Sequence, residues 1–337
     1  MERKGSIGIV GLGLIGGSIA IALRGKRRVV GTSRDPETVE YALSHGMIDE
    51  AAKSYEDFRS CDAVIVCTPL SVVERTVREL YAVLGEDVVI SDVGSVKGML
   101  SGLPGRIVGG HPMAGTEQSG VRAAKERLLE NAYYILVDYG GRHDDLELMR
   151  SVAEDCGALP VTMTADEHDK LVAKISHLEH MAAYALVNSA MTGDERIVGS
   201  GFMDTTRIAS SSPEFWNTVA HLNRDNVLAE TDRYIATLTY LRDMIARGED
   251  ITPFLAEAKA KRDKLTYRKR YMTSYVLYVD VPDRVGSIVG VLARLADAGV
   301  SVGNLTVMDS REGAGGALRL ELRDEETYKK AKEILHK

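Results

Sequence analysis

A glycine-rich turn near the start of the chain constrains its fold more than any other feature. Residues 6–18 read SIGIVGLGLIGGS: an apolar run ends at Val10, glycines follow in the spacing G-x-G-x-x-G, and a helix-like stretch comes next. In a strand–turn–helix unit, the first glycine permits the tight turn, the second lets a pyrophosphate approach the backbone, and the third packs the helix on the strand. The unpaired N–H groups at the helix start attract the phosphates. The residues expected to contact a dinucleotide here are Gly11, Gly13, Leu14, Ile15 and Gly16.

Further apolar runs rich in β-branched residues follow the glycine motif. They lie at residues 27–33, 62–69, 87–95, 106–112 and 132–138, with a helical pattern at 71–84. Such alternation predicts an α/β fold of the Rossmann type, with a doubly wound parallel sheet. Ligands of these folds bind at the carboxyl ends of the strands. The residues at the ends of these runs, just after the expected strands, should lie with the glycine loop at one edge of the sheet; they are Thr68, Pro69, Ser95 and His111.

Residues 109–120, GGHPMAGTEQSG, place a histidine among glycines at the end of one of these runs. The segment is too rich in glycine for a helix and too broken for a strand. It is therefore predicted to be a loop that approaches a ligand closely. The alternative is a loop histidine that is bonded only to backbone.

The end of the second predicted strand bears on the choice of cofactor. An NAD site usually carries Asp or Glu there, which binds the ribose 2′-hydroxyl. This chain has Ser33 and Arg34, whose hydroxyl and guanidinium groups suit a 2′-phosphate. Asp35 comes one or two positions late, and before Pro36 it is expected to cap the next helix. NADP is therefore favoured over NAD.

A helical pattern replaces the strand–helix alternation from about Thr164 onward. Residues 164–191 and 201–248 have the apolar spacing of helices, with a break at SSSP and with Thr164 or Asp166 as candidate N-caps. Binding sites commonly lie where two domains meet. We therefore expect this helical part to supply the other wall of the site and a homodimer interface.

Several polar side chains stand out in the helical region. His177 and His180 are three residues apart on one helical face, but no third ligand and no HExxH motif accompany them, so a metal is disfavoured against a structural role. Arg207 lies among small and apolar residues, where a lone cation would be costly. It is expected to pair with Asp204 or with an anionic ligand. Trp216, the only tryptophan, is expected in the core.

Composition and charge exclude several classes of protein. The chain has 337 residues, 45% of them hydrophobic, and a formal net charge of -7, which does not suit a general nucleic-acid binder. Its three cysteines lack metal or disulfide spacing, as expected in a reducing cytoplasm. Residues 5–23 carry no charge, but their six glycines argue against a signal peptide or membrane helix.

The last part of the chain has a pattern of its own. Residues 259–271 are basic and are expected to end a helix and form a linker. An alternating strand, an amphipathic helix that stops at Gly299, two strands and a last helix follow. This order is that of a small ferredoxin-like α+β domain without its final strand.

Several of these segments together carry a family resemblance. GLGLIGGS, DVGSVKG, GGHPMAGTEQSG, ADEHDKLVAKISHLEH and DTTRIASSSPEFW, in this order over about residues 6–245, resemble prephenate/arogenate dehydrogenases of tyrosine biosynthesis. The family commonly has proline where this chain has Glu179. The resemblance implies oxidative decarboxylation of prephenate to 4-hydroxyphenylpyruvate. Hydride leaves ring carbon C4 for a nicotinamide, carbon dioxide leaves the ring, and aromatisation drives the reaction.

The resemblance also implies roles for single residues. A neutral His111 would accept the hydrogen bond of the C4 hydroxyl. Ser95 would bind His111 or the nicotinamide end. The substrate contacts that the resemblance implies are Thr116 and Glu117, which would shape the loop, His180 from the helical side, and Arg207, which would hold a carboxylate.

The C-terminal part is similar to the ACT domain, an amino-acid-sensing module. The matching segments are VPDRVGSI and VSVGNLTV, with Val285 in place of the usual proline. By position, the candidate effector residues are Asp283, Gly286 and Asn304. We expect feedback by tyrosine, and a purely structural dimerisation unit is the alternative.

These observations divide the chain into four parts. They are a Rossmann domain (1–163), a helical substrate and dimerisation domain (164–258), a linker (259–272) and an ACT-like domain (273–337).

The leading function is prephenate dehydrogenase with NADP or NAD. The alternatives are arogenate dehydrogenase, another β-hydroxyacid-type dehydrogenase, and a non-catalytic sensor of nucleotide and amino acid.

Overall fold

The computed structural model describes residues 5–115, 118–190, 197–264, 275–282, 284–309 and 316–335. The chain divides into two compact units, Met1–Thr239 and Tyr240–Lys337. The division into four parts stays a prediction.

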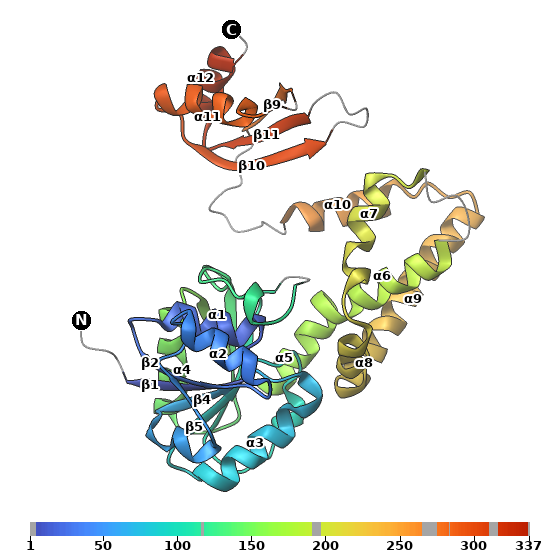
Figure 1. Ribbon diagram of the computed structural model, residues 1–337. Helices are drawn as coiled ribbons and strands as arrows, with labels where there is room; N and C mark the ends of the chain where they lie inside the picture. The colour runs from blue at the N-terminus through green and yellow to red at the C-terminus, as the bar shows by residue number, and fades with distance from the viewer. Residues whose placement is uncertain are drawn as a thin grey trace. The chain divides into compact units, whose positions relative to one another are not determined.

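The first unit is built on an eight-stranded sheet (Figure 1). Its strands, in the order β3-β2-β1-β4-β5-β6-β7-β8, are β3 (Glu50–Ala51), β2 (Arg28–Thr32), β1 (Ser6–Val10), β4 (Ala63–Val66), β5 (Val89–Asp92), β6 (Ile107–Pro112), β7 (Tyr133–Asp138) and β8 (Leu159–Met163). The Rossmann-type fold is confirmed, but the sheet is not entirely parallel. Strand β7 is antiparallel to β6, and β8 is parallel to β7.

Helices cover both faces of the sheet, which is why β4, near its centre, is apolar throughout. Helices α1 (Leu14–Leu23), α2 (Pro36–Ser44) and α4 (His143–Asp155) pack on one face, and α3 (Leu70–Leu84) packs on the other (Figure 1). In β4, Ala63 and Ile65 enter the first core while Val64 and Val66 enter the second. Because strand side chains alternate between faces, one run of four apolar residues serves both cores.

The segment predicted as a loop at 109–120 begins as a strand. Residues 109–112 belong to β6, and His111 pairs with Ile135 of β7. A Cβ atom on Gly110 would lie 2.4 Å from the Asp92 carbonyl oxygen, so glycine is needed where β5 and β6 approach. The glycines here therefore allow close strand packing, and they do not break the strand.

The helical part of the first unit follows β8. It comprises α5 (Ala165–Val172), a π-helical turn, η4 (Ala173–His177), α6 (Leu178–Ala190), α7 (Ser200–Thr206), a 3₁₀ turn, η6 (Arg207–Ser210), α8 (Pro213–Leu222) and most of α9 (Arg224–Ala246), which continues into the second unit at Tyr240. Thr164 is the N-cap of α5, and its hydroxyl and the Glu167 carboxylate form a reciprocal capping box.

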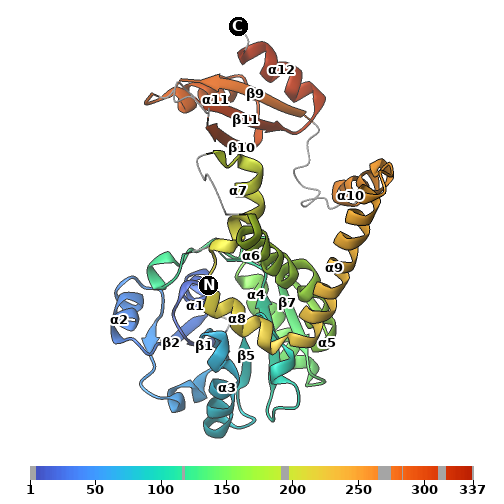
Figure 2. The same cartoon turned by 90° about the vertical axis from the view of Figure 1, so that its right-hand side faces the viewer.

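Helix α8 packs against the start of α3 and joins the helical part to the sheet (Figure 2). Trp216 and Val219 of α8 contact Leu70 and Val96 in a buried apolar cluster. Trp216 is 7% exposed, as expected for a core residue.

The second unit contains a small antiparallel sheet. Helix α10 (Thr252–Lys264) precedes the described elements β9 (Tyr275–Val281), α11 (Ser287–Asp297), β10 (Val302–Asp309), β11 (Gly316–Leu322) and α12 (Glu325–Leu335). The strand order is β10-β11-β9, and Leu318 and Leu320 of the central strand are fully buried. This arrangement is the ferredoxin-like order expected from the sequence, without a fourth strand in the described part.

None of the helices in the described ranges is both long and apolar enough to cross a membrane.

Candidate active site

The glycine loop between β1 and α1 has the shape that a dinucleotide phosphate requires. Gly11 has φ +101°, and a Cβ atom on Gly16 would lie 2.0 Å from the Gly11 carbonyl oxygen. In contrast, a Cβ atom on Gly13 would meet nothing within 4 Å. Gly13 is the N-cap of α1 and provides no side-chain cap, so the N–H groups of Leu14 and Ile15 begin a helix that is open to an anion.

Thr68 and Pro69 follow the end of β4 and lead into α3 beside this loop. The Gly11 backbone lies against the Cys67 carbonyl, since a Cβ atom on Gly11 would be 2.6 Å from it. The Thr68 hydroxyl is buried and has no hydrogen-bond partner among the described residues. A buried hydroxyl without a partner is costly, so this atom is suited to bind a ligand. The glycine loop and Thr68 together fit a nicotinamide dinucleotide.

The end of β2 presents Ser33 half-buried and Arg34 exposed. Asp35 is the N-cap of α2, as expected from the sequence, and its carboxylate accepts hydrogen bonds from the N–H groups of Glu37 and Thr38. The first carboxylate after β2 in the sequence is thus used in capping.

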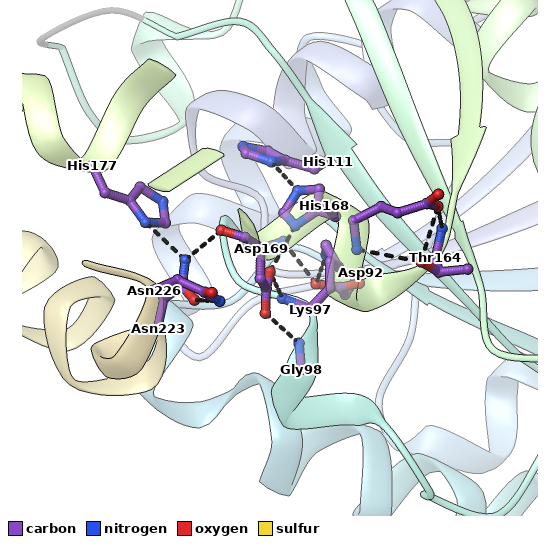
Figure 3. A network of polar contacts seen from close by, with 12 residues as sticks. Asp92, Lys97, Gly98, His111, Thr164, His168, Asp169, His177, Asn223 and Asn226 are labelled. Atoms are coloured by element: carbon purple, nitrogen blue, oxygen red, sulfur yellow. Dashed lines mark hydrogen bonds and ion pairs between the residues drawn. The ribbon is translucent and has the colours of Figure 1, made fainter. Parts of the chain in front are cut away.

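His111 of β6 and His168 of α5 lie in direct contact (Figure 3). The Nδ1 atom of His111 is 2.8 Å from the Nε2 atom of His168, and the Nδ1 atom of His168 is 2.7 Å from Oδ1 of Asp169. His168 is fully buried, whereas His111 is half-buried. The strand and the helix thus bring two imidazoles and a carboxylate together in a chain of hydrogen bonds.

The Asp169 carboxylate is held by backbone donors. Oδ1 accepts a hydrogen bond from the Lys97 N–H and Oδ2 accepts one from the Gly98 N–H, both at 2.8 Å. Burial alone would raise the pKa of Asp169, but the hydrogen bonds from His168 and from these two N–H groups outweigh it and lower the pKa. Asp169 is therefore ionised at neutral pH.

Lys97 places a buried cation next to the two imidazoles. Its Nζ atom lies 2.5 Å from Oδ2 of Asp92, and neither side chain is exposed. Burial, with the charge of Lys97 as a further cause, lowers the pKa of His168. Burial, followed by the charges of His168 and Lys97, lowers the pKa of His111 well below its ordinary value. Both imidazoles are thus neutral at pH 7 and able to accept protons.

The sequence did not single out His168 or Asp169. The capping box at Thr164 and Glu167 marks the start of the helix that carries them, but it gives no indication that both residues are buried. In the described part of the chain Ser95 makes no hydrogen bond to His111, whose Nδ1 atom contacts His168. The other role of Ser95, beside the nicotinamide, stays a prediction.

His177 and His180 have different neighbours in the structure. His177 is buried, its Nδ1 atom lies 3.2 Å from Nδ2 of Asn223, and burial lowers its pKa to about 4. His177 ends the π-helical turn, a distortion that is frequent at functional sites. In the described ranges, no three His, Cys, Asp or Glu side chains are grouped so that they could hold a metal ion.

His180 lies on the indole of Trp216 and near a charged residue from another segment. The rings of His180 and Trp216 are stacked, with centroids 3.6 Å apart. Burial and the charge of Arg207 lower the pKa of His180, against the effect of the Ser176 carbonyl. Arg207 is exposed at the start of η6, so its guanidinium can reach a ligand. The structure thus places these two predicted substrate residues close together.

Some predicted residues cannot be compared with the structure. Thr116, Glu117 and Asp283 lie outside the described residues, as does the side chain of Asn304. Gly286 has φ +89° and is the N-cap of α11, at the strand–helix turn where an effector was expected.

Family models match three consecutive parts of the chain. The nucleotide-binding domain of prephenate dehydrogenase matches residues 19–162, its dimerization domain matches residues 164–257, and the ACT domain matches residues 275–337. The first match begins after the glycine loop. The assignment of that loop as a dinucleotide-binding turn therefore depends on its glycine spacing and its geometry.

Individual proteins are similar over most of their length. Prephenate dehydrogenase of Bacillus subtilis (strain 168) is 35% identical over 99% of this chain and 96% of its own. The crystal structure of A. aeolicus prephenate dehydrogenase in complex with hydroxyphenyl propionate and NAD+ has a TM-score of 0.71 and 34% identity, covering 78% of this chain and 99% of that chain. Synechocystis arogenate dehydrogenase has a TM-score of 0.69 and 31% identity, with coverage of 77% and 99%. The resemblance and fold class predicted from the sequence are confirmed.

Proposed function

The chain belongs to the prephenate dehydrogenase family, and from this premise we propose that it converts prephenate to 4-hydroxyphenylpyruvate and carbon dioxide in tyrosine biosynthesis. One observation carries the proposal most directly. His111, a neutral imidazole bonded through Nδ1, has no other partner in the described part of the chain and lies on a strand of the sheet that carries the glycine loop.

The residues of this chain would accept a proton from the substrate and bind its negative charge. A bound nicotinamide supplies the acceptor for the hydride that leaves C4 of the ring. As hydride leaves, the C4 hydroxyl becomes acidic, and Nε2 of His111 takes its proton. Loss of carbon dioxide then returns an electron pair to the ring, and the phenolate oxygen takes the proton back. Arg207 would hold a substrate carboxylate and His180 would face the substrate from the helical side.

A direct test of this role is His111→Asn. We expect kcat to fall by at least about 10²–10⁴-fold, the usual contribution of a general base, with dinucleotide affinity retained. Full activity in this variant would remove His111 from the mechanism.

Arogenate is the second candidate substrate, because a carboxylate lies near the proposed site. Oε1 of Glu179 is 4.0 Å from Nδ1 of His180, and its side chain is 55% exposed. A carboxylate here would attract the ammonium group that distinguishes arogenate from prephenate. The substitution Glu179→Gln tests this role, since it should lower kcat/KM for arogenate more than for prephenate.

We propose NADP as the preferred cofactor. Arg34 is exposed at the end of β2 and, in the part of the chain that the structure describes, its side chain makes no hydrogen bond or ion pair. The Asp35 carboxylate, which in an NAD site would bind the ribose, is occupied in capping α2. A 2′-phosphate therefore has a cation available to it.

We propose a homodimer formed through the helical part. Leu228, Ile235 and Leu238 of α9 are 49%, 54% and 47% exposed, and their spacing places them on one face of the helix. Exposed apolar faces of this kind mark interaction surfaces. The match to a dimerization domain over residues 164–257 supports this assignment. Light scattering of the purified protein measures the oligomeric state directly.

The ACT-like part is proposed to bind tyrosine as a feedback effector. The left-handed turn at Gly286 before α11 is the feature that supports this assignment. Titration of the full chain with tyrosine, with phenylalanine as a matched control, tests it. Unchanged activity and no heat of binding would leave only a structural role.

A cytoplasmic location is proposed from the free cysteines. Cys61 and Cys156 are buried, and burial raises their pKa values to about 11 and about 12. Such thiols are inert core residues, as expected in a reducing compartment.

The experiment that tests the function is a steady-state assay of prephenate and arogenate, each with NAD and NADP. One pair with the highest kcat/KM would identify substrate and cofactor together. No reduction of either cofactor by folded protein would contradict the proposal.

A further inference from the structure

We infer that His168 and Asp169 are positioning residues that fix the tautomer of His111. In this tautomer Nδ1 carries the proton, and the unprotonated Nε2 faces the substrate. This inference rests on the proposed function, because it explains how His111 is kept ready to accept the proton of the C4 hydroxyl. Neither residue would touch the substrate.

The first step concerns Asp169, which can only accept hydrogen bonds. Its carboxylate takes backbone N–H groups at both oxygens, from Lys97 and Gly98. An ionised carboxylate has no proton to donate, so its contact of 2.7 Å with Nδ1 of His168 requires a proton on that nitrogen.

The second step follows from the neutrality of His168. A neutral imidazole carries one proton, and here Nδ1 holds it, so Nε2 of His168 is a hydrogen-bond acceptor. The contact of 2.8 Å between this atom and Nδ1 of His111 then requires a proton on His111 Nδ1. The Nε2 atom of His111 is consequently unprotonated. A carboxylate in the helix thus determines which nitrogen of a strand residue can accept a proton.

The surrounding charges keep the two imidazoles neutral. The groups that act on them are Lys97 and Asp92 from the β5 side, Asp169 from α5 and His177 from the π-helical turn. The Lys97 ammonium opposes a positive charge on either ring. Asp169 favours a positive charge on His168, so a proton taken up at His111 Nε2 is stabilised through the same chain of bonds.

The network is fixed by groups that do not reach the substrate. Nδ2 of Asn223 donates to the Asp169 carbonyl at 2.8 Å, and Nδ2 of Asn226 donates to Oδ1 of Asn223 at 2.8 Å. Tyr139 donates its hydroxyl to the Lys97 carbonyl at 2.9 Å. A purely structural network would need these contacts but would not need a particular tautomer of His111, which is what the experiment must measure.

The first measurement is nitrogen NMR of the full chain labelled with ¹⁵N-histidine. The chain has eight histidines, and the His111 signals are identified by their loss in His111→Asn. We expect Nδ1 of His111 to be protonated and Nε2 to be unprotonated near pH 7. A proton on Nε2 would overturn the inference. This measurement needs no substrate, so it stands even if the proposed reaction fails in the assay.

The second measurement is kinetic. His168→Leu leaves His111 Nδ1 without an acceptor, and we expect kcat to fall by about 10³–10⁴-fold, as for loss of the orienting carboxylate in a Ser-His-Asp triad. KM and dinucleotide affinity should stay within about threefold of the wild type, since binding groups are intact. His168→Gln, whose amide oxygen can accept the Nδ1 proton, should recover about tenfold or more of the lost kcat.

A matched control is Asp145→Asn, which weakens an ion pair outside the site between buried Asp145 and partly exposed Arg106. It should lower stability and leave kcat near the wild-type value. Equal kcat in His168→Leu and His168→Gln, or an equal loss in Asp145→Asn, would overturn the positioning role. Absence of turnover in the wild type with both substrates would instead contradict the proposed function. The tautomer of His111 would still be measured by NMR, which needs no substrate.

Discussion

The Nζ atom of Lys97 lies 2.5 Å from Oδ2 of Asp92, and both side chains are fully buried. Asp92 ends β5, and its carboxylate also accepts the N–H groups of Gly94 and Gly110. The pair therefore joins the end of one strand to the turn that follows it and to the next strand. It also places a cation beside His111 and His168, so that stability and chemistry depend on the same two residues.

The two members of this pair should differ in their effect on stability. Asp92→Asn leaves a buried ammonium without its counter-charge, and the free energy of unfolding should fall by about 3–5 kcal/mol. Lys97→Met should cost less, because the Asp92 carboxylate keeps two N–H donors. Urea unfolding of both variants and of the double variant measures the difference. A larger loss in Lys97→Met than in Asp92→Asn would contradict this account.

The pH dependence of activity should reflect a base with a lowered pKa. Because burial and nearby positive charge lower the pKa of His111, kcat/KM should stay constant through pH 6.5 and fall only at more acidic pH. Lys97→Met removes one of the lowering charges, so the acidic limb should move to higher pH in this variant. A wild-type limb centred at or above pH 6.5 would show that His111 is not the group that titrates.

Much of the fold was predictable because local sequence patterns determine its strands, helices and turns. The glycine spacing after Val10 and the alternation of apolar strands with helices identified the Rossmann-type sheet, and Asp35 was identified as a helix cap from the proline after it. The direction of β7 was not predictable, since an apolar run reads the same in a parallel or antiparallel pair.

The candidate site was predictable only in part. His111 was found because glycines surround it, but its place within β6 depends on pairing with β7, which outweighs the local preference of glycine. His168 was missed because its partner is 57 residues away in the sequence. Contacts of this kind arise from packing of a helix on a sheet, and no local spacing encodes them.

Acid should destabilise the folded protein through His177. Its pKa is about 4 in the folded state and near 6.5 when unfolded, so between these values only the unfolded chain takes up the proton. The free energy of unfolding should therefore fall as pH decreases from 6.5 towards 4, by at most about 3 kcal/mol from this group, and should not depend on it above pH 6.5. His111 and His168 act in the same direction.

The measurement is urea unfolding at pH 7.5 and pH 5 for His177→Gln and for His221→Gln, a control at an exposed histidine. The loss of stability between the two pH values should be smaller in His177→Gln than in the wild type. An identical pH dependence in all three proteins would rule out His177 as a source.

Cofactor preference should depend on Arg34. Replacing it with serine removes the exposed cation at the end of β2, and a charge-assisted contact with phosphate contributes about 1.5–3 kcal/mol. The ratio of kcat/KM for NADP to that for NAD should thus fall by about ten- to a hundredfold. Steady-state kinetics with both cofactors measure this ratio, and Arg24→Ser, at another exposed arginine, is the control. An unchanged ratio would remove Arg34 from cofactor recognition.

The glycine loop offers a pair of substitutions that separates folding from cofactor binding. A Cβ atom on Gly16 would lie 2.0 Å from the Gly11 carbonyl oxygen, so Gly16→Ala must displace backbone and should lower the melting temperature of the free protein. A Cβ atom on Gly13 meets nothing within 4 Å, so Gly13→Ala should fold normally. If a pyrophosphate approaches the backbone at Gly13, the same methyl group would occupy its space, and dinucleotide affinity should fall by about tenfold or more. Thermal unfolding without cofactor and calorimetric titration with NADP and NAD test both variants. Wild-type affinity in Gly13→Ala would mean that the phosphates bind elsewhere, since this substitution leaves the free protein unperturbed.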